Sequence, residues 1–142
     1  MKASMGKSAM SRASSKSPRS REMPLIFVVD DNPDVAELAE TILSLAGYKV
    51  KRFCDPTATL KALRDSNPKP AVLVTDYDMG VMTGLELVQF SRVFHPNLKT
   101  LMFSGTVEGD VVLSHPVKVD KFLSKPFHAS QLTALVNEFF RI

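Results

Sequence analysis

Short, continuous apolar runs alternate with amphipathic stretches from Pro24 onward, and this alternation leaves the chain very few ways to fold. Runs such as 25–29 (LIFVV) and 71–75 (AVLVT) are rich in β-branched residues, which is typical of strands buried on both faces. The predicted strands are residues 25–29, 48–53, 71–75, 98–104 and 119–124, with the alternating pattern of an edge strand at 48–53. Strands that alternate with helices imply right-handed βαβ crossovers, and therefore a parallel sheet with helices on both faces.

The stretches between these strands carry helix signals. Asn32 and Asp55 are N-cap residues, each followed by a proline at the first helical position. In the first helix apolar residues recur at helical spacing, with Leu38 and Leu45 among the side chains expected to face inward, and Gly47 ends the helix. The predicted helices are residues 33–46, 56–65, 83–94 and 128–141, with one short helix around 111–113 in the poorly patterned stretch 106–119.

Residues 1–22 differ from the rest of the chain in composition and charge. They are rich in Ser, Lys and Arg and carry six basic residues against one acidic residue, whereas residues 23–142 carry twelve basic and fourteen acidic residues. Because so polar a segment cannot bury enough apolar surface to offset its conformational entropy, we expect a disordered basic tail at 1–22 and one folded domain at 23–142. The tail is either a basic arm for nucleic acid or an acidic partner, or a dispensable solvated leader.

Cysteine usage and hydropathy bear on the compartment. The chain has one cysteine, Cys54, which excludes an internal disulfide and fits a reducing compartment. No apolar run approaches the roughly 18 residues that a membrane-spanning helix needs. The N-terminal charges are not followed by the apolar stretch of a secretory signal. We therefore expect a cytoplasmic protein with no membrane partner.

Charged and polar residues stand where the predicted strands end. They are Asp30 and Asp31 after the first strand, Asp76 and Asp78 after the third, Ser104 at the end of the fourth and Lys125 after the fifth. The carboxyl ends of the strands in a parallel α/β sheet meet at one edge, where binding sites collect. Carboxylates gathered at one edge repel one another unless a cation joins them, and a set of oxygen ligands favours Mg²⁺.

The same set of residue types suits phosphoryl transfer. A lysine supplies fixed positive charge and a serine hydroxyl donates a hydrogen bond, and both can stabilise the oxygens of a transferring phosphoryl group. A carboxylate among them can act as the nucleophile and become an aspartyl phosphate. The sequence therefore predicts Mg²⁺-dependent phosphoryl transfer at the carboxyl edge of the sheet.

A series of short motifs follows the predicted strand ends in order. It consists of the acid pair 30–31, Asp76, the run MTGLE at 82–86, Ser104-Gly105 and the run KPF at 125–127. Each motif is weak alone, but together they make residues 24–142 resemble the receiver domain of two-component response regulators, whose own runs read MDGLEL and KPF. The resemblance implies a three-layer, flavodoxin-like α/β fold with a five-stranded parallel sheet of order 2-1-3-4-5.

The resemblance also implies roles for the acidic residues. Asp76 would be the phosphoacceptor. Asp31 and Asp76 would bind Mg²⁺ directly, with Mn²⁺ as the other suitable ion. The backbone carbonyl of Asp78 would be a third protein ligand, and Asp30 would act through water.

Three further residues receive roles from the resemblance. Lys125 would pair with Asp76 or its phosphate, and Ser104 would bond a phosphate oxygen. Ser104 and Phe122 would form the switch, in which the rotamer of Phe122 reports activation; ordinary core packing is the alternative for Phe122. A cis peptide bond would join Lys125 to Pro126.

The resemblance finally implies partners. The phosphoryl donor would be a histidine kinase or a phosphotransfer protein, and phosphorylation would switch a surface that binds a downstream protein. Such a domain gains and loses its own phosphoryl group and is not expected to be an enzyme. Nucleic acid is expected as a partner only through the basic tail, and a homodimer is an open alternative.

Two other function classes stay open at this point. One is a pseudo-receiver, which keeps the fold as an interaction module without phosphorylation. The other is a phosphatase of the haloacid dehalogenase type, because Asp76 and Asp78 after a strand resemble its nucleophile and acid pair. The acid pair after the first strand and the short loops argue against this phosphatase.

Overall fold

The computed structural model describes residues 23–105 and 116–141. Within these ranges the sheet has the strand order β2-β1-β3-β4-β5, and each neighbouring pair is parallel. The strands are β1 (Leu25–Val29), β2 (Lys49–Phe53), β3 (Val72–Asp76), β4 (Lys99–Ser104) and β5 (Lys121–Ser124). The predicted fold class and strand order are confirmed, and β2 is an edge strand as expected.

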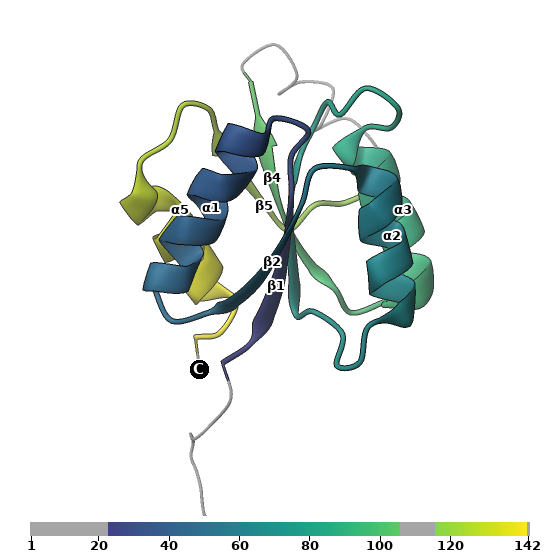
Figure 1. Ribbon diagram of the computed structural model, residues 1–142, viewed down its shortest axis with the longest axis horizontal. Helices are drawn as coiled ribbons and strands as arrows, with labels where there is room; N and C mark the ends of the chain where they lie inside the picture. The colour runs from purple at the N-terminus through teal and green to yellow at the C-terminus, as the bar shows by residue number, and fades with distance from the viewer. Residues whose placement is uncertain (1–22, 106–115, 142) are drawn as a thin grey trace, which may run out of the picture.

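Helices cover both faces of this sheet, which gives three layers (Figure 1). The described helices are α1 (Pro33–Leu45), α2 (Pro56–Asp65), α3 (Gly84–Phe94) and α5 (Ala129–Glu138). Figure 1 shows α1 and α5 on one face and α2 and α3 on the other. The predicted tail at 1–22 and the predicted short helix around 111–113 lie outside the described residues. No helix in the described ranges has the length and apolar character that crossing a bilayer requires.

The helix starts follow from local hydrogen bonds. The Oδ1 atom of Asn32 accepts from the backbone N–H of Asp34 at 3.0 Å, and Oδ1 of Asp55 accepts from the N–H of Thr57 at 3.1 Å. Each bond satisfies one of the free N–H groups of a first helical turn. Gly47 follows α1 at φ +103°, a conformation that favours glycine and ends the helix.

The core is divided by the sheet into two clusters. In β1, Ile26 and Val28 belong to the cluster beneath α1 and α5, whereas Phe27 and Val29 belong to the cluster beneath α2 and α3. All four side chains are buried. Successive residues of a strand face opposite sides of a sheet, so the apolar run of β1 contributes to the core on both faces.

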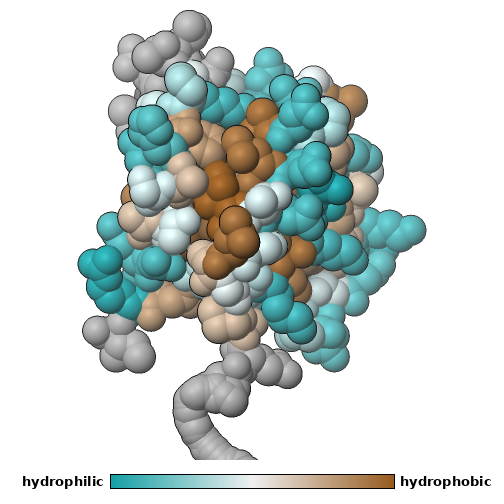
Figure 2. All heavy atoms as spheres, turned by 60° about the vertical axis from the view of Figure 1, so that its left-hand side comes forward, coloured by the Kyte–Doolittle hydropathy of each residue, from teal (hydrophilic) through white to brown (hydrophobic). Residues whose placement is uncertain are grey.

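The expected inward face of α1 was wrong at two positions. Leu38 is 50 % exposed and Leu45 is 85 % exposed, and the buried face is formed by Ala36, Ala39, Ile42 and Leu43. Apolar residues cover more of the circumference of α1 than the sheet can bury, so helical spacing alone does not decide which of them face inward. The small side chains of Ala36 and Ala39 are buried, whereas Leu38 and Leu45 lie outside this face. Figure 2 shows apolar surface among polar side chains on the side of the molecule that α1 and α5 form.

Candidate functional site

Three carboxylates come together at the carboxyl edge of the sheet. Asp30 follows β1 directly, Asp31 follows Asp30, and Asp76 is the last residue of β3. Each of them offers one oxygen, and these oxygens lie within 4.8 Å of one another. Asp30 is buried, Asp76 is partly buried and Asp31 is exposed, so the group opens to solvent on one side. Carboxylate oxygens in this number and spacing fit a hard divalent cation such as Mg²⁺.

The ammonium group of Lys125 bridges two of these carboxylates. Its Nζ lies 2.8 Å from Oδ1 of Asp76 and 3.1 Å from Oδ2 of Asp30. Lys125 follows β5, and its backbone N–H donates to the carbonyl of Ser104 at 3.0 Å, which continues the β4–β5 ladder past the end of both strands. The Lys125–Pro126 peptide bond is cis, as predicted.

The electrostatics of the site reflect burial and crowded charge. Burial raises the pKa of Asp30 and the neighbouring charge of Asp76 raises it further, while the N–H of Asn32 and the ammonium of Lys125 oppose the rise. Burial lowers the pKa of Lys125, but the hydrogen bond to Asp76 and the charges of both carboxylates outweigh it, and the net shift is upward. The lysine is therefore held charged and the buried carboxylate is destabilised in its charged form.

The side chain of Asp78 does not belong to the carboxylate group. Its Oδ1 accepts from the N–H of Gly80 at 3.2 Å, and its backbone forms an isolated antiparallel bridge with Thr83. Gly80 has φ +78°, so the segment between β3 and α3 turns sharply at this glycine. The role expected for Asp78, metal binding through its backbone carbonyl, stays a prediction.

Gly84 lies in the MTGLE run at 82–86, and the structure shows that it positions the backbone near Asp76. A Cβ placed on Gly84 would lie 2.2 Å from the carbonyl oxygen of Asp76 and 2.9 Å from the methyl carbon of Met102. Only glycine lets α3 begin this close to the end of β3. Thr83 and Glu86 form a capping box at the same helix start, with bonds of 2.9 and 3.2 Å. The MTGLE run thus fixes the backbone that follows Asp76.

The predicted switch residues lie on β4 and β5. Ser104 is the last residue of β4 and is 7 % exposed, next in sequence to Phe103, whose backbone pairs with Asp76. Phe122 pairs with Met102 across β4 and β5 and is 36 % exposed. An exposed ring does not fit ordinary core packing, which was the alternative for Phe122. Its role as a switch stays a prediction.

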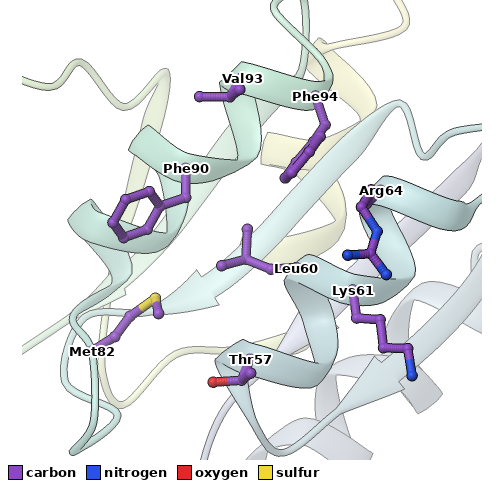
Figure 3. A pocket seen from close by; sticks show the side chains of 8 residues that line it. All are labelled: Thr57, Leu60, Lys61, Arg64, Met82, Phe90, Val93 and Phe94. Carbon is purple, nitrogen blue, oxygen red and sulfur yellow. The ribbon is translucent and has the colours of Figure 1, made fainter.

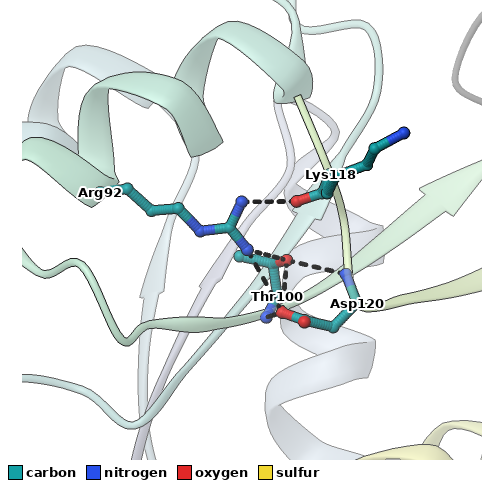
Figure 4. A network of polar contacts seen from close by, with 4 residues as sticks. All are labelled: Arg92, Thr100, Lys118 and Asp120. Carbon is teal, nitrogen blue, oxygen red and sulfur yellow. Dashed lines mark hydrogen bonds and ion pairs between the residues drawn. The ribbon is translucent and has the colours of Figure 1, made fainter. Parts of the chain in front are cut away.

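A polar network at the opposite edge of the sheet was not predicted (Figure 4). The Oδ2 atom of Asp120 accepts from the backbone N–H and hydroxyl of Thr100, at 2.8 and 3.0 Å, and from Arg92 at 3.3 Å. Arg92 also donates to the carbonyl of Lys118. These bonds connect α3 to the starts of β4 and β5, at the sheet edge opposite the carboxylate group at residues 30, 31 and 76. The sequence carries little indication of this network, because Asp120 is distant along the chain from Arg92 and Thr100.

Comparisons with known proteins agree with this geometry. The family model described as response regulator receiver domain matches residues 26–137. The chain is 30 % identical over 112 residues to the C4-dicarboxylate transport transcriptional regulatory protein DctD of Rhizobium meliloti, covering 77 % of this chain and 24 % of that protein. It is 29 % identical over 119 residues to the transcriptional regulatory protein PrrA of Mycobacterium bovis, covering 83 % of this chain and 50 % of that one. The chain thus spans half or less of the length of these curated relatives.

A solved structure supports the same relationship. The crystal structure of the receiver domain of NtrX from Brucella abortus superimposes with a TM-score of 0.73 at 27 % identity, covering 80 % of this chain and 96 % of that one. The family match, the strand order and the acidic edge of the sheet lead to one conclusion. This chain belongs to the response regulator receiver domain family, the receiver part of two-component regulation.

Proposed function

We propose that this protein accepts a phosphoryl group on Asp76 from a histidine kinase or a phosphotransfer protein. The observation that supports this most is the geometry around Asp76, whose carboxylate lies 2.8 Å from the ammonium of Lys125 and within 4.8 Å of two further carboxylates. Asp76 is also partly exposed, so a phosphoryl donor can reach it. A fixed cation beside a reachable carboxylate is what an aspartyl phosphate needs.

In the proposed step, an oxygen of Asp76 forms a bond to the phosphorus while the bond from phosphorus to the donor's histidine nitrogen breaks. The imidazole leaves with that electron pair. Lys125 and Ser104 stabilise charge on the phosphoryl oxygens. Asp31, Asp76 and the carbonyl of Asp78 would hold Mg²⁺ or Mn²⁺, with Asp30 acting through water. Such an ion would supply positive charge that offsets the charge of the carboxylates and of the incoming phosphoryl group.

The proposed output is a change of a protein-binding surface. Lys125 now pairs with Asp76 and Asp30, and a phosphoryl group on Asp76 would offer it new oxygen partners. Ser104 and Phe122 would follow as the switch and present a new surface to a downstream protein. The chain is proposed to work in the cytoplasm as a signalling domain and not as an enzyme with turnover. Basic residues in 1–22 are the place for any contact with nucleic acid.

The test is labelling with acetyl phosphate and Mg²⁺. Intact-protein mass spectrometry should show a gain of one HPO₃ group in the parent, no gain in Asp76→Asn, and the parental gain in the matched control Asp78→Asn. Chelation of Mg²⁺ should abolish the gain. Equal labelling of Asp76→Asn would exclude Asp76 as the acceptor. Absence of labelling by both acetyl phosphate and a panel of histidine kinases would favour the pseudo-receiver, and continuous release of phosphate from p-nitrophenyl phosphate would favour the phosphatase.

A further inference from the structure

An apolar groove runs between α2 and α3, on the face of the sheet opposite α1 and α5 (Figures 1 and 3). Its volume is about 570 Å³. Its apolar lining consists of Leu60 from α2, Met82 from the segment before α3, and Phe90, Val93 and Phe94 from α3. Figure 3 shows the side chains of the two helices on either side of the groove.

Three large apolar side chains of α3 in the groove have a high exposed fraction. Val93 is 75 % exposed, Phe90 is 47 % exposed and Phe94 is 40 % exposed. These three residues occupy neighbouring positions on one helix, so they form a continuous patch and not scattered surface contacts. A contiguous apolar patch in a hollow, next to polar side chains, is typical of a protein-binding site.

The charge at the groove's border is positive. Lys61 and Arg64 line its α2 side, and among the described residues no acidic side chain lines it. Arg64 is paired with Asp65 at 2.9 Å. Lys69 adds a further positive charge behind the end of α2, where it donates to the carbonyls of Leu63 and Arg64. The border of the groove therefore keeps a net positive charge.

This charge selects among the occupants that the groove could take. A second copy of the chain, placed groove to groove, would bring Lys61 and Arg64 against the same basic border. The segment 1–22 has six basic residues against one acidic residue and would be repelled in the same way. A partner segment with acidic side chains beside its apolar face gains attraction where the other two meet repulsion.

We propose that the groove between α2 and α3 binds an amphipathic helix of a partner protein. Its apolar side chains would cover Phe90 and Phe94, and its acidic side chains would lie along Lys61 and Arg64. The lining residues of α2 run from Thr57 to Arg64, about 10 Å at 1.5 Å per residue, which suits anchors at i, i+3 or i+4, and i+7 of a docked helix.

The groove between α1 and α5 offers no comparable argument. It has a volume of about 490 Å³ and is lined by Ile42, Leu45 and mostly small residues, without charged side chains. Nothing in its lining distinguishes an acidic from a basic occupant. Its exposed Leu45 is instead a matched control for loss of apolar surface.

The test uses two fluorescein-labelled peptides of about four helical turns, roughly 14 residues. Both carry leucines along one face, and they differ only in having Glu or Lys beside that face. Binding to the full chain is measured by fluorescence anisotropy. The Glu peptide should bind at least about tenfold more tightly than the Lys peptide, and Phe90→Ser should weaken it about tenfold, as expected for an aromatic anchor.

Matched variants separate the contribution of charge to peptide binding from the contribution of apolar area. The double variant Lys61→Glu/Arg64→Glu should reverse the preference between the peptides, whereas Lys49→Glu/Lys51→Glu and Leu45→Ser should bind as the parent does. Val93→Ser is the second groove variant, and circular dichroism checks that each variant is folded. Asp76→Asn should bind the Glu peptide normally, because the groove does not depend on phosphoryl transfer.

Two results would overturn the proposal. One is equal affinity of the protein for the two peptides. The absence of any rise in anisotropy for either peptide, at protein concentrations that would saturate a helix bound in a groove, would count in the same way. The other is a dimer, detected by sedimentation equilibrium, that Phe90→Ser dissociates, because a second copy would then be the occupant. The peptide-binding and sedimentation measurements do not involve phosphorylation, so a failure of phosphorylation at Asp76 would not change their outcome.

Discussion

Gly84 lies directly against the backbone of Asp76, since a Cβ on Gly84 would be 2.2 Å from the carbonyl oxygen of Asp76. That carbonyl belongs to the last residue of β3 and cannot move without moving Asp76, the proposed phosphoacceptor. The start of α3 and the position of Asp76 are therefore set by one close backbone contact.

Gly84→Ala should destabilise the fold by about 3 kcal/mol, because overpacking against backbone finds no flexible side chain to displace. Urea unfolding measures the loss. The matched control is Gly80→Ala, where a Cβ meets no atom within 4 Å and only the φ of +78° opposes it. That control should lose about 1–2 kcal/mol. A Gly84→Ala protein as stable as the parent would show that α3 can shift away from Asp76 at little cost.

Lys125→Ala should destabilise the metal-free protein at neutral pH. The change leaves the carboxylates of Asp30 and Asp76 without their shared cation. Loss of a fully buried partner costs several kcal/mol, but Lys125 is partly exposed, so we expect about 1–2 kcal/mol. Thermal unfolding in EDTA measures the loss, and Lys99→Ala at the opposite edge is the control. Added Mg²⁺ should raise the melting temperature of Lys125→Ala more than that of the parent; an equal rise would contradict this account.

Asp31→Ala should weaken Mg²⁺ binding by at least about tenfold, since the change removes one carboxylate from a proposed site that has few protein ligands. Isothermal titration calorimetry measures the affinity. Asp34→Ala removes a nearby acid in the first turn of α1 that is not part of the carboxylate group, and should bind Mg²⁺ as the parent does. Parental affinity in Asp31→Ala would remove Asp31 from the site.

Asp30→Asn should stabilise the metal-free protein at pH 7. Burial raises the pKa of Asp30 above its ordinary value of 3.8, so its contribution to stability is present at low pH and is lost as pH rises through the folded-state pKa. Asparagine does not ionise and escapes this loss. The gain over the parent should shrink as pH falls toward 3.8, as measured by urea unfolding in EDTA.

The control for this pH effect has the opposite sign. A hydrogen bond from Arg64 lowers the pKa of Asp65, so Asp65→Asn should lose stability above the ordinary pKa of 3.8, by a small amount because the pair is exposed. A metal-free Asp30→Asn protein that is less stable than the parent at pH 7 would mean that the attraction of Lys125 outweighs the burial of Asp30.

The parts of the site that the sequence could predict depend on strand ends. Asp30, Asp76 and Lys125 each follow a predicted strand, and parallel strands bring such positions to one edge whatever the details of packing. The contacts of Gly84 and of Asp120 could not be predicted in this way. They depend on how closely α3 approaches the sheet, which is a property of packing and not of periodicity.

The exposed apolar residues show the same limit of prediction from sequence patterns. Periodicity placed Leu38 and Leu45 on the apolar face of α1 together with Ala39 and Ile42, but only the last two of these four are buried. Phe90, Val93 and Phe94 likewise follow helical spacing and remain exposed. A sequence pattern identifies an apolar face, whereas the partner of that face is known only once the neighbouring elements are placed.

The proposed role of Asp76 is tested most directly by locating the phosphoryl group chemically. The protein is phosphorylated with acetyl phosphate and Mg²⁺ and reduced with borohydride, which converts an aspartyl phosphate to homoserine. The peptides are then sequenced by mass spectrometry. Phosphorylation of Asp76 should give homoserine at position 76, with Asp30, Asp31 and Asp78 unchanged. Homoserine at another aspartate, with position 76 unmodified, would contradict the proposed role of Asp76.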